Sequence, residues 1–277
     1  MYDDGTASAR GAVATVSAAA SQAVAELLEG PVQPVVSLGN STHIAWFGVG
    51  DDVVVLGDGE AVRQPNSVVI AGAAASDVLA AAGRGARLGS GGLEVGPHRV
   101  SVVRWWDPHP ALSATAPDVV RLFLSAAATL VPPVGADSLE AALTAGDPAA
   151  IVAEAEQFVG RGPGLTPTGD DLLTGAFGAY VLIGEALRDE RPEAVLAAAK
   201  VGIEGLLGRT VSFSAALLRH AMSGRVSVPV AQVLRALLGR TPLDDAVEAL
   251  LRVGNTSGRA LAQGVLVGAE AACAVAK

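Results

Sequence analysis

Residues 160–171 read Gly-Arg-Gly-Pro-Gly-Leu-Thr-Pro-Thr-Gly-Asp-Asp, and this run separates two segments with helical patterns. Its glycines let the backbone approach a ligand closely, and its prolines fix the path of the loop. The following segment, residues 172–187, is apolar enough for a buried helix. The run therefore brings hydroxyls, backbone N–H groups and two carboxylates to a helix N-terminus, where anions are readily bound.

The same run also has an architectural interpretation. Thr168 and Asp171 have the spacing of a capping box, with Asp in the place of the usual Glu. Residues 239–245 repeat a shorter phrase, Gly-Arg-Thr-Pro-Leu-Asp-Asp, again before a predicted helix. That echo lacks the additional glycines of the longer run. A simple helix cap does not need these glycines, so they favour a ligand site. From the residues alone, a ligand site and ordinary helix-start punctuation both stay open.

The chain before residue 108 is rich in short β-forming runs separated by turn residues. Regular short strands with such turns predict an antiparallel sheet or a small barrel. The Ala- and Val-rich residues 7–28 predict a helix that stops at Gly30-Pro31, and residues 76–82 predict a second, short helix. The predicted strands lie at residues 35–38, 42–47, 53–56, 68–70, 93–95 and 100–106.

After residue 108 the pattern becomes helical, with Gly or Pro at nearly every junction. We therefore predict an α+β protein. Residues 1–108 form an N-terminal helix plus a β-rich module, and residues 109–277 form an all-α domain that carries the Gly-rich run. The predicted helices span residues 117–130, 137–145, 148–159, 168–187, 192–207, 210–222, 228–238, 242–253 and 256–276.

Composition excludes several classes of protein. With 277 residues, 51% of them hydrophobic, the chain can bury a sizeable core. Its net charge of −9, without a basic stripe, argues against nucleic acid as a partner. The single cysteine, Cys273, excludes an intramolecular disulfide and a cysteine-based zinc site. The N-terminal residues lack a basic, apolar leader and no transmembrane run is present, so we expect a cytoplasmic protein that does not bind membranes.

Three predicted helix starts share glycines, hydroxyls and a nearby arginine: residues 160–171, 208–214 and 254–259. If their N-termini converge, they form a polar pocket suited to an anion. The alternative is three ordinary caps that face solvent. The polar candidates in the second and third starts are Thr210, Ser214, Asn255, Thr256, Ser257 and Gly258.

In the β-rich half, Asn40, Ser41 and His43 lie together at the entrance to a predicted strand. His43 is a candidate general acid or base, with Asn40 and Ser41 as candidate binding groups at the rim that faces the helical half. Equally, Asn40 and Ser41 could be turn residues and His43 a satisfied core histidine.

Asp170 and Asp171 are the remaining candidate catalytic residues. Carboxylate oxygens could bind Mg²⁺, the one metal ion that the sequence suggests. Adjacent helical residues point about 100° apart, so only one of the pair would face a given ligand. The histidines have no zinc-ligand spacing, and no phosphate loop or dinucleotide motif is present, so no cofactor is predicted with certainty.

Residues 162–171 closely resemble the signature of the AllH-like family, long catalogued as a domain of unknown function. This family includes the AllH subunit of oxamate carbamoyltransferase, from allantoin degradation in purine catabolism. In weaker form, the resemblance extends to residues 41–43, to Thr210 with Ser214, and to residues 254–258, and it covers most of the chain. The family usually has His at the position of Asn255, so the resemblance does not carry an acid or base role to this residue.

The resemblance implies a subunit of a complex that converts oxalurate and phosphate to oxamate and carbamoyl phosphate. Other subunits and a small anionic substrate are then the partners, and a homo-oligomer is also compatible. Asp170 or Asp171 would orient an amide N–H or hold Mg²⁺, while backbone N–H groups near Gly164 and Gly169 would stabilise a developing oxyanion. The implied anion-binding set is Asn40, Ser41, Gly162, Gly164, Thr166, Thr168, Gly169, Thr210, Ser214, Asn255, Thr256, Ser257 and Gly258.

Two other functions remain open from the sequence. One is a non-catalytic subunit that binds a metabolite or acts as a scaffold, because no strong nucleophile is evident. The other is a Mg²⁺-dependent hydrolase of a phosphate or amide substrate that uses Asp170 and Asp171.

Overall fold

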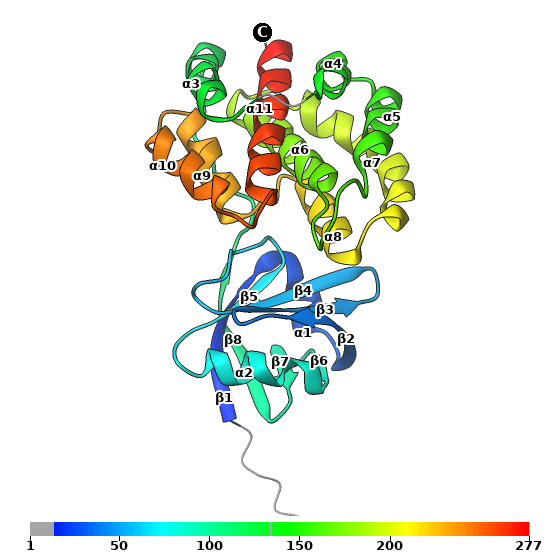
Figure 1. Cartoon of the computed structure of the whole chain (residues 1–277), viewed down its shortest axis with the longest axis vertical. Helices are drawn as coiled ribbons and strands as arrows, with labels where there is room; N and C mark the ends of the chain where they lie inside the picture. Colours follow the sequence, from blue (N-terminus) through cyan, green and yellow to red (C-terminus); the bar gives the residue numbers. More distant parts are fainter. Residues whose placement is uncertain (1–13, 133–134, 277) are drawn as a thin grey trace, which may run out of the picture. The chain divides into compact units, whose positions relative to one another are not determined.

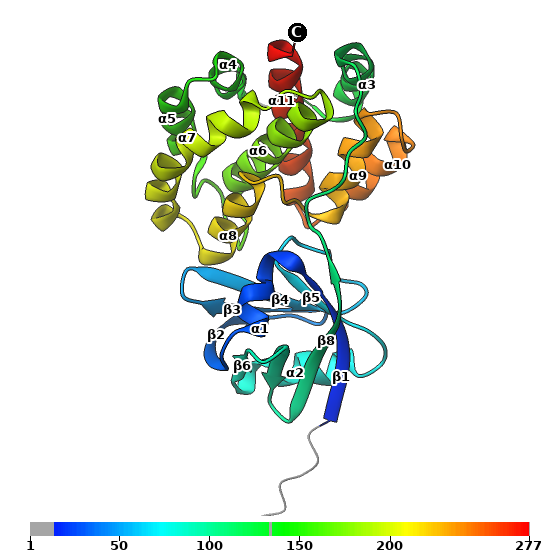
Figure 2. The same cartoon turned by 180° about the vertical axis from the view of Figure 1, so that it is seen from behind.

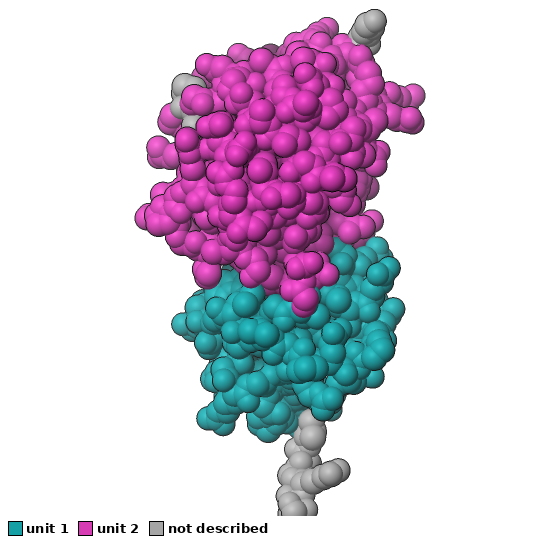
Figure 3. All heavy atoms as spheres, turned by 90° about the vertical axis from the view of Figure 1, so that its right-hand side faces the viewer, with its two compact units in different colours: residues 1–49, 54–61, 67–106 teal, residues 50–53, 62–66, 107–277 magenta. Residues whose placement is uncertain are grey.

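The computed structural model of the chain describes residues 14–132 and 135–276. These residues divide into two compact units, which Figure 3 shows in different colours. One unit is centred on residues 14–106 and the other on residues 107–276, and the short segments 50–53 and 62–66 group with the second. The first unit is β-rich and the second helical, which confirms the predicted α+β class.

The β-rich unit is a closed barrel in the strand order β1-β5-β4-β3-β2-β6-β7-β8 (Figure 1). Closure removes the exposed edges that an open sheet would leave. The small barrel, one of the two predicted arrangements, is therefore the one adopted. Its strands are β1 (Ala14–Ser21), β2 (Gln33–Asn40), β3 (Ile44–Val49), β4 (Asp52–Gly57), β5 (Ser67–Ile70), β6 (Ala86–Leu88), β7 (Gly92–Val95) and β8 (His98–Trp106).

Alternation of buried and more exposed residues along the strands builds the barrel core. In β3 every second residue is buried, namely Ala45, Phe47 and Val49. This period of two is the pattern of a strand with one face toward a core. Two short helices, α1 (Ala25–Glu29) and α2 (Ala75–Ala81), add Leu28 and Leu79 to the same apolar cluster.

The helix predicted over residues 7–28 is wrong for residues 14–21, which form β1; residues 7–13 lie outside the described residues. The alanines of β1 favour a helix locally. However, β1 pairs with β5 on one side and with β8 on the other, and this pairing outweighs local propensity.

The β1–β8 and β4–β5 pairs are parallel, so the barrel is mixed rather than purely antiparallel. Strand β6 was not predicted within its Gly-rich segment.

The predicted helices of the second half are confirmed within two residues of their bounds. Proline in the first turn of α3, α5, α7 and α9 helps to set where these helices begin. None of the helices in residues 14–132 and 135–276 combines the length and the apolar character that a membrane span requires. The helices are α3 (Pro117–Leu130), α4 (Asp137–Ala145), α5 (Pro148–Phe158), α6 (Thr168–Ala186), α7 (Arg191–Leu206), α8 (Ser212–Ala221), α9 (Val228–Leu237), α10 (Leu243–Leu251) and α11 (Ser257–Val275).

Helices α6 and α11 lie side by side at the centre of the helical unit, with the other helices around them (Figures 1 and 2). Glycines bring their backbones into contact: a Cβ on Gly264 would lie 2.0 Å from the carbonyl oxygen of Leu172, and one on Gly268 the same distance from that of Ala176. Contacts on both helices advance together along the chain, so the two helices run parallel. Their N-termini therefore lie at the same end of the unit.

Candidate functional site

The starts of α6 and α11 meet through two hydroxyl groups. Thr166 Oγ1 and Ser257 Oγ lie 2.8 Å apart, although 91 positions separate these residues in the sequence. Parallel packing of the two long helices produces this encounter, because it carries both preceding loops to the same end. Each helix start lacks a side-chain cap, and its N-terminal dipole favours an anion nearby.

A pocket of about 320 Å³ opens between these two helix starts. Five of the predicted site residues line it, together with Pro163 and Leu165. The φ angle of Gly164 is +96°, a backbone conformation that glycine adopts without strain. The predicted residues in the lining are Gly164, Thr166, Asn255, Thr256 and Ser257.

Asp171 lies beside the two hydroxyls and is only 3% exposed. Burial raises the pKa of its carboxyl from 3.8 to about 7; the hydroxyls of Ser257 and Thr166 oppose this shift, and the charge of Asp170 adds to it. Its Oδ2 atom is buried and has no hydrogen-bond partner among the described residues. A carboxyl group with a pKa near neutrality and an unsatisfied oxygen is typical of a functional position.

Asp170 has a different environment, although it is fully buried. Its Oδ1 accepts a hydrogen bond of 2.8 Å from the backbone N–H of Gly160, and its Oδ2 accepts one from the hydroxyl of Thr210. Both oxygens are thus engaged within the protein. Asp170 ties the loop before α6 to the segment before α8 instead of facing the pocket residues.

The helix start at residues 208–214 therefore meets the start of α6, but through Asp170. A Cβ on Gly160 would lie 2.4 Å from the carbonyl oxygen of Arg209, so these two segments are in direct backbone contact. Ser214 is buried in the first turn of α8. All three predicted helix starts converge within the helical unit, and those of α6 and α11 line the pocket.

Several other members of the predicted set lie in backbone contacts. The N–H of Gly169 donates to the carbonyl of Arg161 at 2.9 Å, so it is not available to an oxyanion, contrary to expectation. A Cβ on Gly258 would lie 2.0 Å from the carbonyl oxygen of Leu250, and one on Gly162 would lie 2.8 Å from the N atom of Thr168. These glycines permit close packing of the loops that frame the pocket.

The capping-box interpretation is wrong. Helix α6 has Pro167 at its N-cap position, and no side chain caps it. The echo at residues 239–245 provides a direct comparison, because Asp244 and Asp245 also stand in a first helical turn but are exposed. Paired aspartates are thus ordinary surface residues in α10, whereas in α6 they are buried.

The magnesium prediction gains no geometric support. Because Asp170 binds Gly160 and Thr210, the two adjacent carboxyl groups do not converge on one ion. Within residues 14–132 and 135–276, no group of three or more His, Cys, Asp or Glu side chains is placed to hold a metal ion.

His43 belongs to the barrel unit and is exposed, so the core-histidine interpretation is wrong. Its Nδ1 lies 2.8 Å from Oδ2 of Asp58. Burial alone would raise the pKa of Asp58, but hydrogen bonds from His43 and from backbone N–H groups outweigh it and lower that pKa. Asn40 donates to the carbonyl of Leu79 at 3.4 Å, and the N–H of Ser41 donates to that of Ile44 at 2.7 Å.

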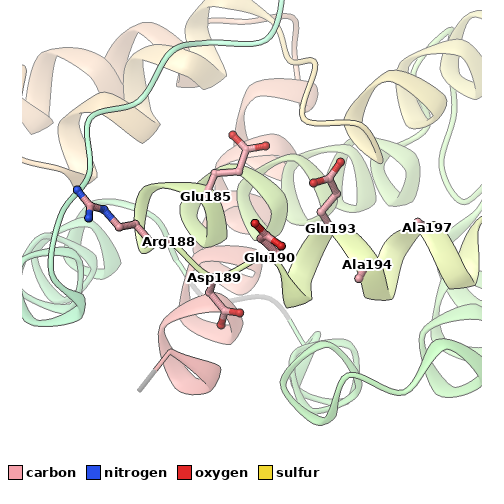
Figure 4. Close-up of a pocket in the computed structure, with 7 residues that line it drawn as sticks. All are labelled: Glu185, Arg188, Asp189, Glu190, Glu193, Ala194 and Ala197. Carbon is pink, nitrogen blue, oxygen red and sulfur yellow. The ribbon is translucent and has the colours of Figure 1, made fainter.

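Sequence reasoning missed two features. The first is the pairing of Asp58, in the turn at residues 57–59, with a histidine 15 positions earlier, because nothing local in the sequence signals that contact. The second is an acidic pocket of about 640 Å³ where α6 ends and α7 begins (Figure 4). Two of its acids already have partners: Glu185 pairs with His109 at 3.0 Å, and Asp189 pairs with Arg191. Its lining is Glu185, Arg188, Asp189, Glu190, Glu193, Ala194 and Ala197.

Comparison with known proteins identifies a family over part of the helical unit. Residues 158–269 match the family model described as oxamate carbamoyltransferase subunit AllH. No curated protein and no solved structure gives a significant match to the chain. The matched segment contains the whole pocket lining together with Asp170 and Asp171. Over these residues the chain is therefore similar to the AllH family, which confirms the resemblance noted at residues 162–171.

Proposed function

We propose that this chain is an AllH-type subunit that binds a small anionic ureido or carboxylate compound and takes part in carbamoyl transfer within a multi-subunit complex. The leading reaction converts oxalurate and phosphate to oxamate and carbamoyl phosphate. The observation that carries the proposal is the pocket between α6 and α11, whose hydroxyls and helix starts lie inside the segment that matches the AllH family.

The chemistry of the pocket suits an anion. Two helix N-termini place partial positive charge at its base, and the hydroxyls of Thr166 and Ser257 supply donors for carboxylate or phosphate oxygens. Asn255 and Thr256 add amide and hydroxyl groups at the exposed edge. Each substrate and product of the leading reaction carries such an oxygen anion.

The proposed reaction needs stabilisation of charge more than a covalent nucleophile. A phosphate oxygen attacks the carbamoyl carbonyl of oxalurate, the bond from this carbon to the oxamate nitrogen breaks, and that nitrogen takes up a proton. Negative charge develops on the carbonyl oxygen in the transition state, where preorganised donors lower the barrier. The remaining subunits of the complex would complete the catalytic site.

The test compares ligand binding by the purified chain with binding by two variants. Oxalurate, oxamate, phosphate and carbamoyl phosphate are screened by thermal shift, since a ligand at about 100 times its dissociation constant adds about 2.7 kcal/mol to stability. Ser257→Ala should abolish the shift. The control is Thr241→Val. Thr241 stands in the echo before α10 where Thr166 stands in the longer run, and its replacement should preserve the thermal shift. A wild-type shift that survives Ser257→Ala would remove the pocket from consideration.

A non-catalytic subunit is the second candidate. It is favoured by the engagement of Asp170 within the protein and by the pKa of Cys273, which burial raises to about 11, so that its thiol is a poor nucleophile. Such a subunit would bind the metabolite but show no turnover when it is assayed alone. In an assembled complex, the rate would not depend on the chemistry of its pocket residues. The Mg²⁺-dependent hydrolase has less support because Asp170 and Asp171 do not converge. A cytoplasmic location remains part of the proposal.

A further inference from the structure

We propose that Asp171 is a positioning residue that holds a proton beneath the pocket, so that binding of a carboxylate or phosphate is coupled to the uptake of one proton. This inference rests on the proposed anion pocket. It gives Asp171 a role behind the hydroxyl pair, in place of direct contact with substrate or metal.

Burial places Asp171 behind the pocket. Its side chain is 3% exposed, and Oδ2 is enclosed without a hydrogen-bond partner among the described residues. Thr166 and Ser257, in contrast, are half-buried and line the pocket, and their hydroxyls act on the carboxyl group of Asp171 by lowering its pKa. A ligand in the pocket therefore meets the two hydroxyls, and Asp171 acts through them.

A count of protons gives the physical basis. Each hydroxyl carries one proton and can both donate and accept. One of the two protons forms the 2.8 Å bond between Thr166 and Ser257, which leaves a single proton to donate elsewhere. An ionised Asp171 accepts that proton and leaves the ligand with none. A neutral Asp171 donates its own proton to the pair, and the remaining hydroxyl proton can then point toward an anion.

Electrostatics leads to the same dependence. The N-termini of α6 and α11 attract an anion, but an ionised carboxyl in the first turn of α6 offsets this attraction. Burial raises the pKa of Asp171 to about 7, so its charge changes near neutral pH. Asp170 is the charged neighbour on the same helix, and its negative charge also favours the neutral form. The positive charge nearest in sequence to the start of α8, on Arg209, is exposed and already paired with Glu156 at 3.0 Å, so it is not paired with Asp171.

The ligand class follows from this arrangement. With Asp171 neutral, the pocket offers two helix N-termini and one free hydroxyl proton, which suits a carboxylate or phosphate oxygen. Above neutral pH, Asp171 is ionised and must take up a proton from solvent when an anion binds, which lowers the apparent affinity for the anion. In linkage terms, the bound complex holds one more proton than the free protein.

The experiment is isothermal titration of the full chain with oxamate and with sulfate between pH 6 and pH 9. Both probes keep a constant charge over this range, so the pH dependence reports on the protein. The wild-type affinity should fall roughly tenfold for each pH unit above 7. Titrations at pH 8.5 in two buffers of different ionisation enthalpy should show close to one proton taken up per ligand bound.

The Asp171→Asn variant separates positioning from a structural role. Its side-chain amide donates to the hydroxyl pair at every pH, so binding should persist with an affinity that no longer depends on pH. Asp245→Asn, which changes the second aspartate of the exposed pair in the first turn of α10, should keep the wild-type pH profile.

Two outcomes would overturn the inference in distinguishable ways. If oxamate or sulfate binds wild type with an affinity that is constant from pH 6 to pH 9, the anion pocket stands and the role of Asp171 fails. If neither probe binds the folded wild-type chain at any pH, the proposed anion site fails as well.

Discussion

Asp170 and Asp171 are neighbours in the sequence, but their carboxyl groups serve different helix starts. Asp170 accepts hydrogen bonds from Gly160 and from Thr210, which lies just before α8, whereas Asp171 lies with Thr166 and with Ser257, the first residue of α11. Adjacent residues on a helix are rotated by about 100°, so a buried pair must meet two different surroundings. One acid thereby joins two segments, while the other remains beside the pocket.

Removing the hydroxyl of Thr210 should destabilise the helical unit. Thr210→Val leaves one oxygen of the fully buried Asp170 without its donor, which costs roughly 1–3 kcal/mol. Thr210→Ser keeps the hydroxyl and should lose much less. Urea denaturation of the three proteins measures the difference. Equal stability of the Val variant and wild type would show that this contact contributes nothing to the fold.

Asp171→Asn should stabilise the protein at pH 8 but not at pH 4. Because the folded protein holds the proton of Asp171 up to about pH 7 and the unfolded chain only up to 3.8, this group lowers wild-type stability as the pH rises between these values. At about 1.4 kcal/mol per pKa unit, the gain approaches roughly 4 kcal/mol at pH 8. Denaturation at both pH values checks this. A gain of the same size at pH 4 would contradict the assignment.

The contact between α6 and α11 should not tolerate a side chain. In Gly264→Ala the new Cβ would lie 2.0 Å from the carbonyl oxygen of Leu172, and the helices would have to move apart, at a cost of roughly 1–3 kcal/mol. Gly205 of α7 offers a matched control, since a Cβ there meets nothing within 4 Å. Gly205→Ala should instead stabilise the protein by about 0.5–1 kcal/mol. Thermal unfolding of both variants measures the contrast.

His220 should make the fold sensitive to acid. Burial lowers its pKa to about 4, and the charges of Arg225 and Arg219 add to this effect. The unfolded chain takes up a proton on this residue near pH 6.5, whereas the folded protein does so only near pH 4. The free energy of unfolding is therefore unaffected by His220 above pH 6.5 and decreases as the pH falls from 6.5 toward 4. His220→Gln should therefore lose less stability than wild type between pH 7 and pH 4. Identical acid profiles would rule out this contribution.

Local signals were sufficient to predict most helices and strands. Pro117, Pro148 and Gly146 mark helix boundaries through properties of their own backbone, and the structure uses them in that way. The alternation in β3 likewise follows from residues two apart. Local propensity is misleading where strand pairing outweighs it, as in the alanine-rich β1 between β5 and β8 and in β6 within its Gly-rich segment.

The order of the elements, the α+β class and the AllH-like run before α6 can all be read from the sequence, because each depends on residues close together in the chain. Three contacts become visible once the chain is folded: β1 pairs with β8 and closes the barrel, Asp170 meets Thr210, and Thr166 meets Ser257. These encounters join residues 40 to 91 positions apart. The one between Thr166 and Ser257 arises where glycines let α6 and α11 pack in parallel, and the one between Asp170 and Thr210 arises where Gly160 lets two loop segments touch. Burial, which sets the pKa of Asp171, likewise follows from this packing and not from neighbours in sequence.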